Sequence, residues 1–196
     1  METRDVLDRK RTAALVLDYQ PTVFARMVKE PLEPLLERAQ QALDTIRSTG
    51  VPVIYVTVGF RAGYPEIDPN NQLVSSFREQ GLFRLGSTDT AVHPAVAPHP
   101  EDVQIVKHRT NAFYGTDLAI VLAARKIDTL ILFGVATSGA VLSSVRYAFD
   151  ADYRVIVVRD CCADPDPEVQ RVLMEKVLAR QASVVAAADL PALLAG

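Results

Sequence analysis

The chain alternates between short apolar runs and longer stretches in which apolar residues recur with helical spacing. The runs have the length of buried strands, and the periodic stretches have the length of surface helices. Strands are expected at residues 12–18, 52–58, 103–107, 129–133, 153–159 and 183–187, and helices at 33–49, 115–126, 138–152 and 167–180. Residues 60–71 contain glycine, proline and asparagine, which favour a long loop.

This alternation predicts the fold class. Repeated strand–helix units with nearly continuous apolar strands are typical of a parallel sheet that is covered on both faces. We therefore expect an α/β, Rossmann-like three-layer sandwich with a six-stranded, mostly parallel sheet. The length of 196 residues suits one domain, and no internal repeat or linker divides residues 1–196.

Composition narrows the class of function. Apolar residues make up 49% of the chain, and the formal net charge of −3 comes without a basic stripe that would suggest nucleic acid. No apolar signal region is evident, and no apolar run reaches the roughly 20 residues that span a bilayer. We expect a cytoplasmic protein with a small-molecule partner and no membrane or nucleic-acid partner. The adjacent Cys161 and Cys162 indicate packed, reduced thiols.

Three polar features stand at the C-terminal ends of predicted strands: Asp18, Lys107 and the turn at 137–140. In parallel α/β sheets this edge binds ligands. We expect Asp18 and Lys107 to end adjacent strands, with their side chains in hydrogen-bond reach. Such a pair can keep a carboxylate charged or let it move a proton. Taken singly, the aspartate could instead cap a turn and the lysine could be a surface residue.

Other candidate residues carry weaker signals. Arg61 and Tyr64, in the loop after the second strand, could contact an anionic or planar substrate or could simply be solvated. The three histidines have no compact ligand spacing, so no metal is expected. Gly134 and Gly139 have the spacing of a phosphate-binding loop, but the Gly-Lys-Ser/Thr ending of that loop is missing.

Four stretches together carry a family resemblance: 14–18 (ALVLD), Lys107 with 109–113 (RTNAF), 134–137 (GVAT), and 153–160 (YRVIVVRD). In their order and spacing they resemble the isochorismatase-like hydrolase superfamily, often called cysteine hydrolases. In members that cleave amides, an Asp, a Lys and a Cys form the catalytic triad. The resemblance places Asp18 and Lys107 at the first two positions. The cysteine position, three residues after Thr137, holds Ala140.

The resemblance also implies the surroundings of the triad. The N–H groups of residues 136 and 140 would bind the oxyanion, and the Val135–Ala136 peptide bond would be cis. No cofactor is implied, and the His-rich metal site of the nicotinamidase branch has no counterpart after the second strand. Relatives assemble through helices beside the site, so we expect a homo-oligomer (dimer or tetramer), with contributions from 184–194 and the helix from Ser138. The residues expected to contact substrate are Phe24, Arg61, Tyr64, Tyr114, Thr137 and Ser138.

Alanine cannot act as a nucleophile, so three hypotheses stay open. The favoured one is a small-molecule amide hydrolase whose cysteine has been replaced by Ala140, which leaves an inactivated form. The second is a hydrolase of vinyl ethers: true isochorismatases resemble this chain, carry a small residue at the cysteine position and use the aspartate, here Asp18, as proton donor. The third is a non-catalytic protein that keeps the pocket and binds a small molecule.

Overall fold

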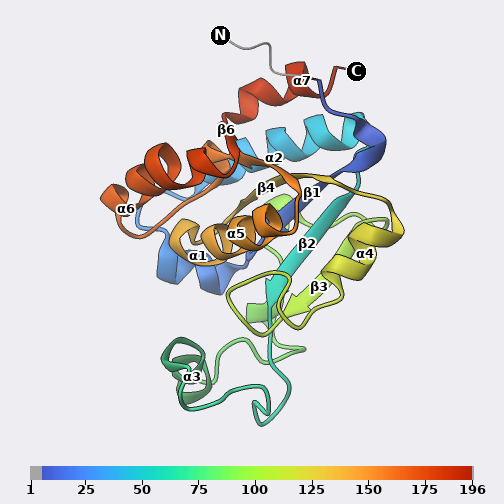
Figure 1. The fold of residues 1–196 in the computed structure, drawn as a ribbon. Helices are drawn as coiled ribbons and strands as arrows, with labels where there is room; N and C mark the ends of the chain where they lie inside the picture. Colours follow the sequence, from blue (N-terminus) through green and yellow to red (C-terminus); the bar gives the residue numbers. More distant parts are fainter. Residues whose placement is uncertain (1–5, 196) are drawn as a thin grey trace.

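The computed structural model describes residues 6–195, and its centre is a six-stranded sheet (Figure 1). The strand order is β3-β2-β1-β4-β5-β6, and each pair of neighbouring strands is parallel. The strands are β1 (Thr12–Leu17), β2 (Val53–Val58), β3 (Val103–Lys107), β4 (Thr129–Gly134), β5 (Arg154–Val158) and β6 (Ser183–Val185). This confirms the predicted α/β class with its parallel six-stranded sheet.

Helices cover both faces of the sheet (Figure 1). Helices α2 and α7 pack together on one side, while α4 and α5 lie on the other. The helices are α1 (Pro21–Met27), α2 (Glu33–Ser48), α3 (Gln72–Glu79), α4 (Leu118–Ala124), α5 (Leu142–Asp150), α6 (Pro167–Val172) and α7 (Leu190–Leu193). No helix in the described part of the chain is both long and apolar enough to cross a membrane.

Several helices differ from the sequence-based expectation. The helix predicted at 138–152 starts as a π-helical turn, Thr137–Val141, and continues as α5. The helix predicted at 167–180 is α6 followed by a π-helical turn and a 3₁₀ turn. Helices α1 and α3 were not expected, because each is too short for its apolar spacing to stand out over several turns.

The core lies on both faces of the two central strands. All six residues of β1 and all six of β4 are buried, which explains their unbroken apolar pattern. Strands β1 and β4 are in close contact at Gly134: a Cβ there would lie 2.5 Å from both the Cβ and the carbonyl oxygen of Leu17. Only glycine fits this contact, which brings the end of β4 against the end of β1.

The order in which strands are added to the sheet reverses between β1 and β4. From β1 the chain moves outward to β2 and then β3, and it returns to place β4 on the other side of β1. In open α/β sheets a ligand-binding crevice forms where the strand order reverses, outside the carboxyl ends of the strands. The residues that follow β1 and β4 are therefore the first place to look for a functional site.

Candidate active site

Asp18 follows β1 directly and turns the chain out of the sheet. Its φ of +53° is in the left-handed region, which Asp tolerates better than most residues. The amide of Asp18 still donates to the carbonyl of Val56 at 2.9 Å, so the residue is held at the strand end. Next to it, the buried Gln20 side chain accepts from the Val58 N–H at 2.8 Å and donates to the Val58 carbonyl at 3.0 Å. These contacts fix the ends of β1 and β2 relative to each other.

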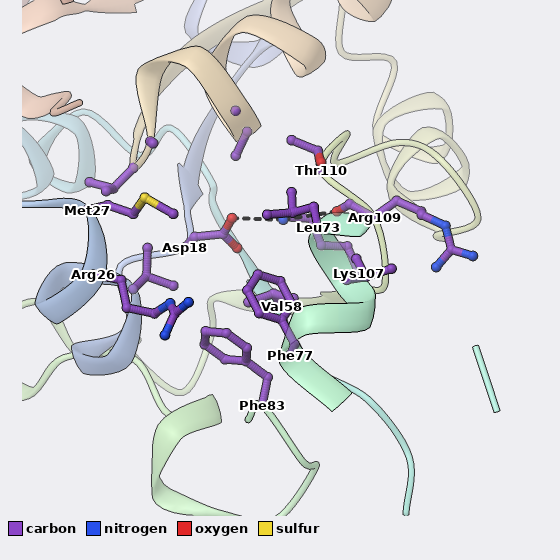
Figure 2. Close-up of a pocket in the computed structure, with 16 residues that line it drawn as sticks. Asp18, Arg26, Met27, Val58, Leu73, Phe77, Phe83, Lys107, Arg109 and Thr110 are labelled. Carbon is purple, nitrogen blue, oxygen red and sulfur yellow. Dashed lines mark hydrogen bonds and ion pairs between the residues drawn. The ribbon is translucent and has the colours of Figure 1, made fainter. Parts of the chain in front are cut away.

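Lys107, the last residue of β3, forms an ion pair with Asp18 (Figure 2). The Nζ–Oδ2 distance is 2.8 Å, and Nζ also donates to the Arg109 carbonyl at 3.1 Å. The expected contact is confirmed, but the expectation that the two residues end adjacent strands is wrong, since β2 lies between β1 and β3. The long lysine side chain spans the width of that intervening strand.

Burial controls the chemistry of this pair. The side chains of Asp18 and Lys107 are 8% and 3% exposed. Loss of hydration raises the pKa of Asp18 above its ordinary value, and the Lys107 charge only partly opposes that rise. The second carboxylate oxygen, Oδ1, is buried and has no hydrogen-bond partner among the described residues. Asp18 is thus a carboxyl group that can exchange a proton with a bound molecule through this oxygen.

A cavity of about 90 Å³ opens beside the ion pair (Figure 2). This space is several times the minimum that one water molecule needs, so the cavity suits a small molecule. Most of its lining is apolar, and the charged groups are few. The lining residues are Asp18, Val23, Arg26, Met27, Val58, Leu73, Val74, Phe77, Phe83, Lys107, Arg109, Thr110, Val135, Ala136, Gly139 and Ala140.

The turn after β4 forms another wall of this cavity. Its Val135–Ala136 peptide bond is cis, as the resemblance implied. Both residues line the cavity, and so does Ala140, which is only 3% exposed. Ala140, the position to which the resemblance assigns the cysteine, therefore shares one small cavity with Asp18 and Lys107. Ala140 offers a methyl group there and no nucleophile.

The six residues that were expected to contact substrate do not line the cavity. Two of them belong to the same turn: Thr137 is fully buried, and Ser138 is exposed with its N–H donating to Asp164 at 2.7 Å. Phe24 packs edge-on against Tyr19 in the core.

The remaining three lie in loops. Arg61 pairs with Glu66 at 2.6 Å, and the Tyr64 hydroxyl donates to the Leu82 carbonyl at 3.0 Å. Tyr114 is 67% exposed on the surface. As the structure has them, none of these three side chains reaches the Asp18–Lys107 pair.

Two short helices supply cavity residues that the sequence analysis missed. Helix α1 contributes Val23, Arg26 and Met27, and α3 contributes Leu73, Val74 and Phe77. Local signals for both helices exist: Pro21 stands at the first position of α1, and the side chain of Asn71 caps α3 by accepting from the Val74 N–H. Which face of these helices meets the cavity depends on tertiary packing.

The two cysteines do not replace the missing nucleophile. Both are buried free thiols, and neither lines the cavity. Burial raises the pKa of Cys162 to about 12 and that of Cys161 further still, so both stay protonated near neutral pH. Residues 6–195 contain no group of three or more His, Cys, Asp or Glu side chains placed to hold a metal ion.

Comparison with known proteins decides the family. The profile of the isochorismatase domain matches residues 12–189, which is nearly the whole chain. The chain belongs to the isochorismatase family. In sequence, this isochorismatase-family chain is 29% identical over 188 residues to the uncharacterised isochorismatase family protein YecD of Escherichia coli O157:H7, covering 91% of this chain and 93% of that protein.

Two further relatives connect the isochorismatase-family fold to hydrolysis. The ureidoacrylate amidohydrolase RutB of Stutzerimonas stutzeri is 30% identical over 177 residues, covering 80% of this chain and 71% of that one. The crystal structure of a cysteine hydrolase from Pseudomonas syringae pv. phaseolicola superimposes with a TM-score of 0.85 at 25% identity, covering 100% of this chain and 99% of that one. By sequence and fold, this chain is an isochorismatase-family hydrolase.

Proposed function

We propose that this cavity is the substrate site of a small-amide hydrolase in which Ala140 occupies the nucleophile position. One observation carries the proposal: Ala140 lines the same cavity as the buried Asp18–Lys107 pair. The relationship to an amidohydrolase supports an amide as the bond at issue. The chain as it stands would bind the amide and would not form an acyl-enzyme with it.

The chemistry of a cysteine at position 140 follows from its neighbours. A thiol there would stand in the π-helical turn that leads into α5 and would share the cavity with Lys107, and both the helix N-terminus and the ammonium group favour the thiolate. The thiolate would attack the amide carbonyl, and the carbonyl oxygen would take up negative charge. Asp18, with a raised pKa and a free Oδ1, would pass a proton to the departing amine.

The experiment is the substitution Ala140→Cys, assayed by ammonia release from a panel of small amides. We expect amide hydrolysis to rise by at least about 10³-fold over the parent chain, because losing a covalent nucleophile costs several orders of magnitude. Ala140→Ser is the matched control, since its hydroxyl is not ionised by these neighbours and should give little activity. Adding Asp18→Asn to the cysteine variant should abolish the gain. Equal inactivity of the parent and the cysteine variant on every amide would contradict the proposal.

A second candidate function has its own supporting observation. The raised pKa of Asp18 and its unpartnered Oδ1 suit a proton donor, which is what hydrolysis of a vinyl ether requires, and no nucleophilic side chain is needed. Under this hypothesis the parent chain itself would hydrolyse isochorismate, and Asp18→Asn would abolish that activity. Vigorous activity of this kind would replace the amide proposal.

We also propose that the chain forms a homo-oligomer, a dimer or tetramer. The exposed Phe149 of α5 supports an interface on that helix, whereas the half-exposed Tyr147 stacks on Phe113 of the same chain. In contrast, Leu190, Leu193 and Leu194 of the C-terminal stretch are buried within the chain and are not available for an interface. A monomer in light scattering at micromolar concentration would contradict this proposal. The single-domain boundaries at 1–196 and the cytoplasmic location stay predictions from the sequence.

A further inference from the structure

The charge of the cavity is opposite to that of the chain. Among all residues of the chain, 24 are acidic and 21 are basic. The cavity lining instead holds three cations, Arg26, Lys107 and Arg109, and one acid, Asp18. Because Asp18 is already paired with Lys107, two positive charges remain around a small and largely apolar space. Such a site favours a ligand that carries negative charge.

The guanidinium groups of these two arginines differ in their direction and in how many protein partners they already have. The Arg109 guanidinium donates to the carbonyls of His108 at 2.7 Å and Glu66 at 2.8 Å, and in Figure 2 it points away from Asp18. Arg26 uses one N–H for Gln80 Oε1 at 2.9 Å, and a guanidinium has five donors. Within residues 6–195, no carboxylate forms an ion pair with Arg26.

Arg26 is an exposed residue, and two contacts orient its guanidinium group. Its guanidinium carbon lies 5.9 Å from the centre of the Phe77 ring, and its Gln80 partner caps the end of α3. The side chain thereby joins α1 to α3 at the cavity. In Figure 2, Arg26 and Lys107 lie on different sides of Asp18. A ligand whose amide meets the Asp18–Lys107 pair can therefore direct its other end to Arg26.

We infer that Arg26 binds a carboxylate of the substrate, so that the site takes a small amide with one carboxylate at the opposite end. The inference rests on the proposed amide-hydrolase function and names its substrate class. The small volume of the cavity favours a compact molecule. The apolar side chains around it, among them Met27, Phe77 and Phe83, favour a short hydrocarbon link between the two polar ends.

The test compares two ligands that differ only in charge. Succinamate has an amide and a carboxylate joined by two methylenes, and 4-oxopentanamide replaces the charged oxygen with a methyl group. The parent chain, which has Ala140, allows binding to be measured by calorimetry without turnover. We expect succinamate, or one of its homologues malonamate and glutaramate, to bind about ten- to a hundredfold more tightly than its neutral counterpart, as a charge-assisted hydrogen bond would give.

Variants of Arg26 separate recognition from structure. Arg26→Gln should lower the affinity for the carboxylate ligand to that for the neutral ligand. The affinity for the neutral ligand itself should not change. Arg26→Lys should keep part of the preference. Arg78→Gln is the matched control, because Arg78 is an exposed arginine of α3 that does not line the cavity, and it should keep the full preference.

Three results would overturn the assignment of Arg26. The parent could bind both ligands with equal affinity at every chain length, or the preference for the carboxylate could survive Arg26→Gln. Alternatively, Arg26→Gln could lower the affinity for both ligands equally, which would mean a structural role only. Failure of the proposed function has a different signature. If carboxylate binding depends on Arg26 but the Ala140→Cys variant cleaves no amide, the amide-hydrolase proposal falls. If that variant cleaves carboxylate-bearing amides equally well with and without Arg26, the role of Arg26 falls and the function stands.

Discussion

Replacing Lys107 with methionine should leave Asp18 as an unpaired acid in the interior. Methionine keeps most of the lysine stem and removes the ammonium group, so the change in packing is small. The two side chains are only 3% and 8% exposed, and little water can reach Asp18 in place of the lost partner. Breaking a buried pair by removing one member costs about 3–5 kcal/mol of unfolding free energy at neutral pH. Loss of the hydrogen bond to the Arg109 carbonyl adds about 1 kcal/mol that does not depend on pH.

The sign of the pH dependence follows from the direction of the pKa shift. Burial already raises the pKa of Asp18 in the folded parent, and removing Lys107 takes away the largest effect that opposes this rise. Between the unfolded and folded pKa values, the folded variant holds a proton that the unfolded chain releases. Stability therefore falls as the pH rises, by up to about 1.4 kcal/mol per pH unit. Lowering the pH from 7 to 5 should restore up to about 2.7 kcal/mol in the variant.

Urea unfolding followed by circular dichroism at pH 5, 6 and 7 measures this directly, which suits a chain without tryptophan. Adding Asp18→Asn to Lys107→Met should remove the pH-dependent part of the loss of unfolding free energy, because neither charge is then present. Lys176→Met, at an exposed lysine, is the matched control and should change stability by less than about 0.5 kcal/mol. If Lys107→Met matched the parent in both stability and pH dependence, the account of a desolvated, mutually dependent pair would be refuted.

Three further predictions concern the scaffold and the thiols. Gly134→Ala should lower the unfolding free energy by about 1–3 kcal/mol in the same urea assay, since its methyl group would meet Leu17 at 2.5 Å; an unchanged midpoint would contradict the close approach of the central strands. Arg47→Met should cost about 3 kcal/mol, because the Arg47 guanidinium lies 2.5 Å from the buried carboxylate of Asp102; double substitution with Asp102→Asn should recover part of the loss. Cys162, buried and with its pKa raised to about 12, should react with an aromatic disulfide reagent only after the protein unfolds in urea, and fast labelling of the native chain would show that the thiol is accessible.

The sequence determined the sheet and most of its helices. Continuous apolar runs such as 12–17 and 129–134 have a local cause, because a strand buried on both faces needs apolar residues at every position. A polar residue that follows such a run marks the end of the strand in the sequence. Asp18, Lys107 and the turn before α5 could thus be singled out as one edge of a parallel sheet, and the family resemblance drew attention to Ala140.

Tertiary structure decided the order of the strands. Nothing local distinguishes a neighbour of β1 from the strand beyond it, because pairing joins segments far apart in the chain. The expectation that Asp18 and Lys107 end adjacent strands was wrong for this reason, since β2 lies between them. The two side chains still meet, because a lysine side chain is long enough to span one strand. The hydrophobic pattern of the sequence does not reveal such a contact.

Tertiary structure also decided which residues enclose the substrate. The loop residues Arg61 and Tyr64 satisfy their polar groups with local partners, Glu66 and the Leu82 carbonyl. The cavity is closed instead by one face each of α1 and α3, helices of seven and eight residues. Isolated helices this short are marginal in water, and packing stabilises them more than their own propensity does. The sequence by itself could therefore locate the reacting end of the site, while the wall that holds Arg26 appears only when the chain is folded.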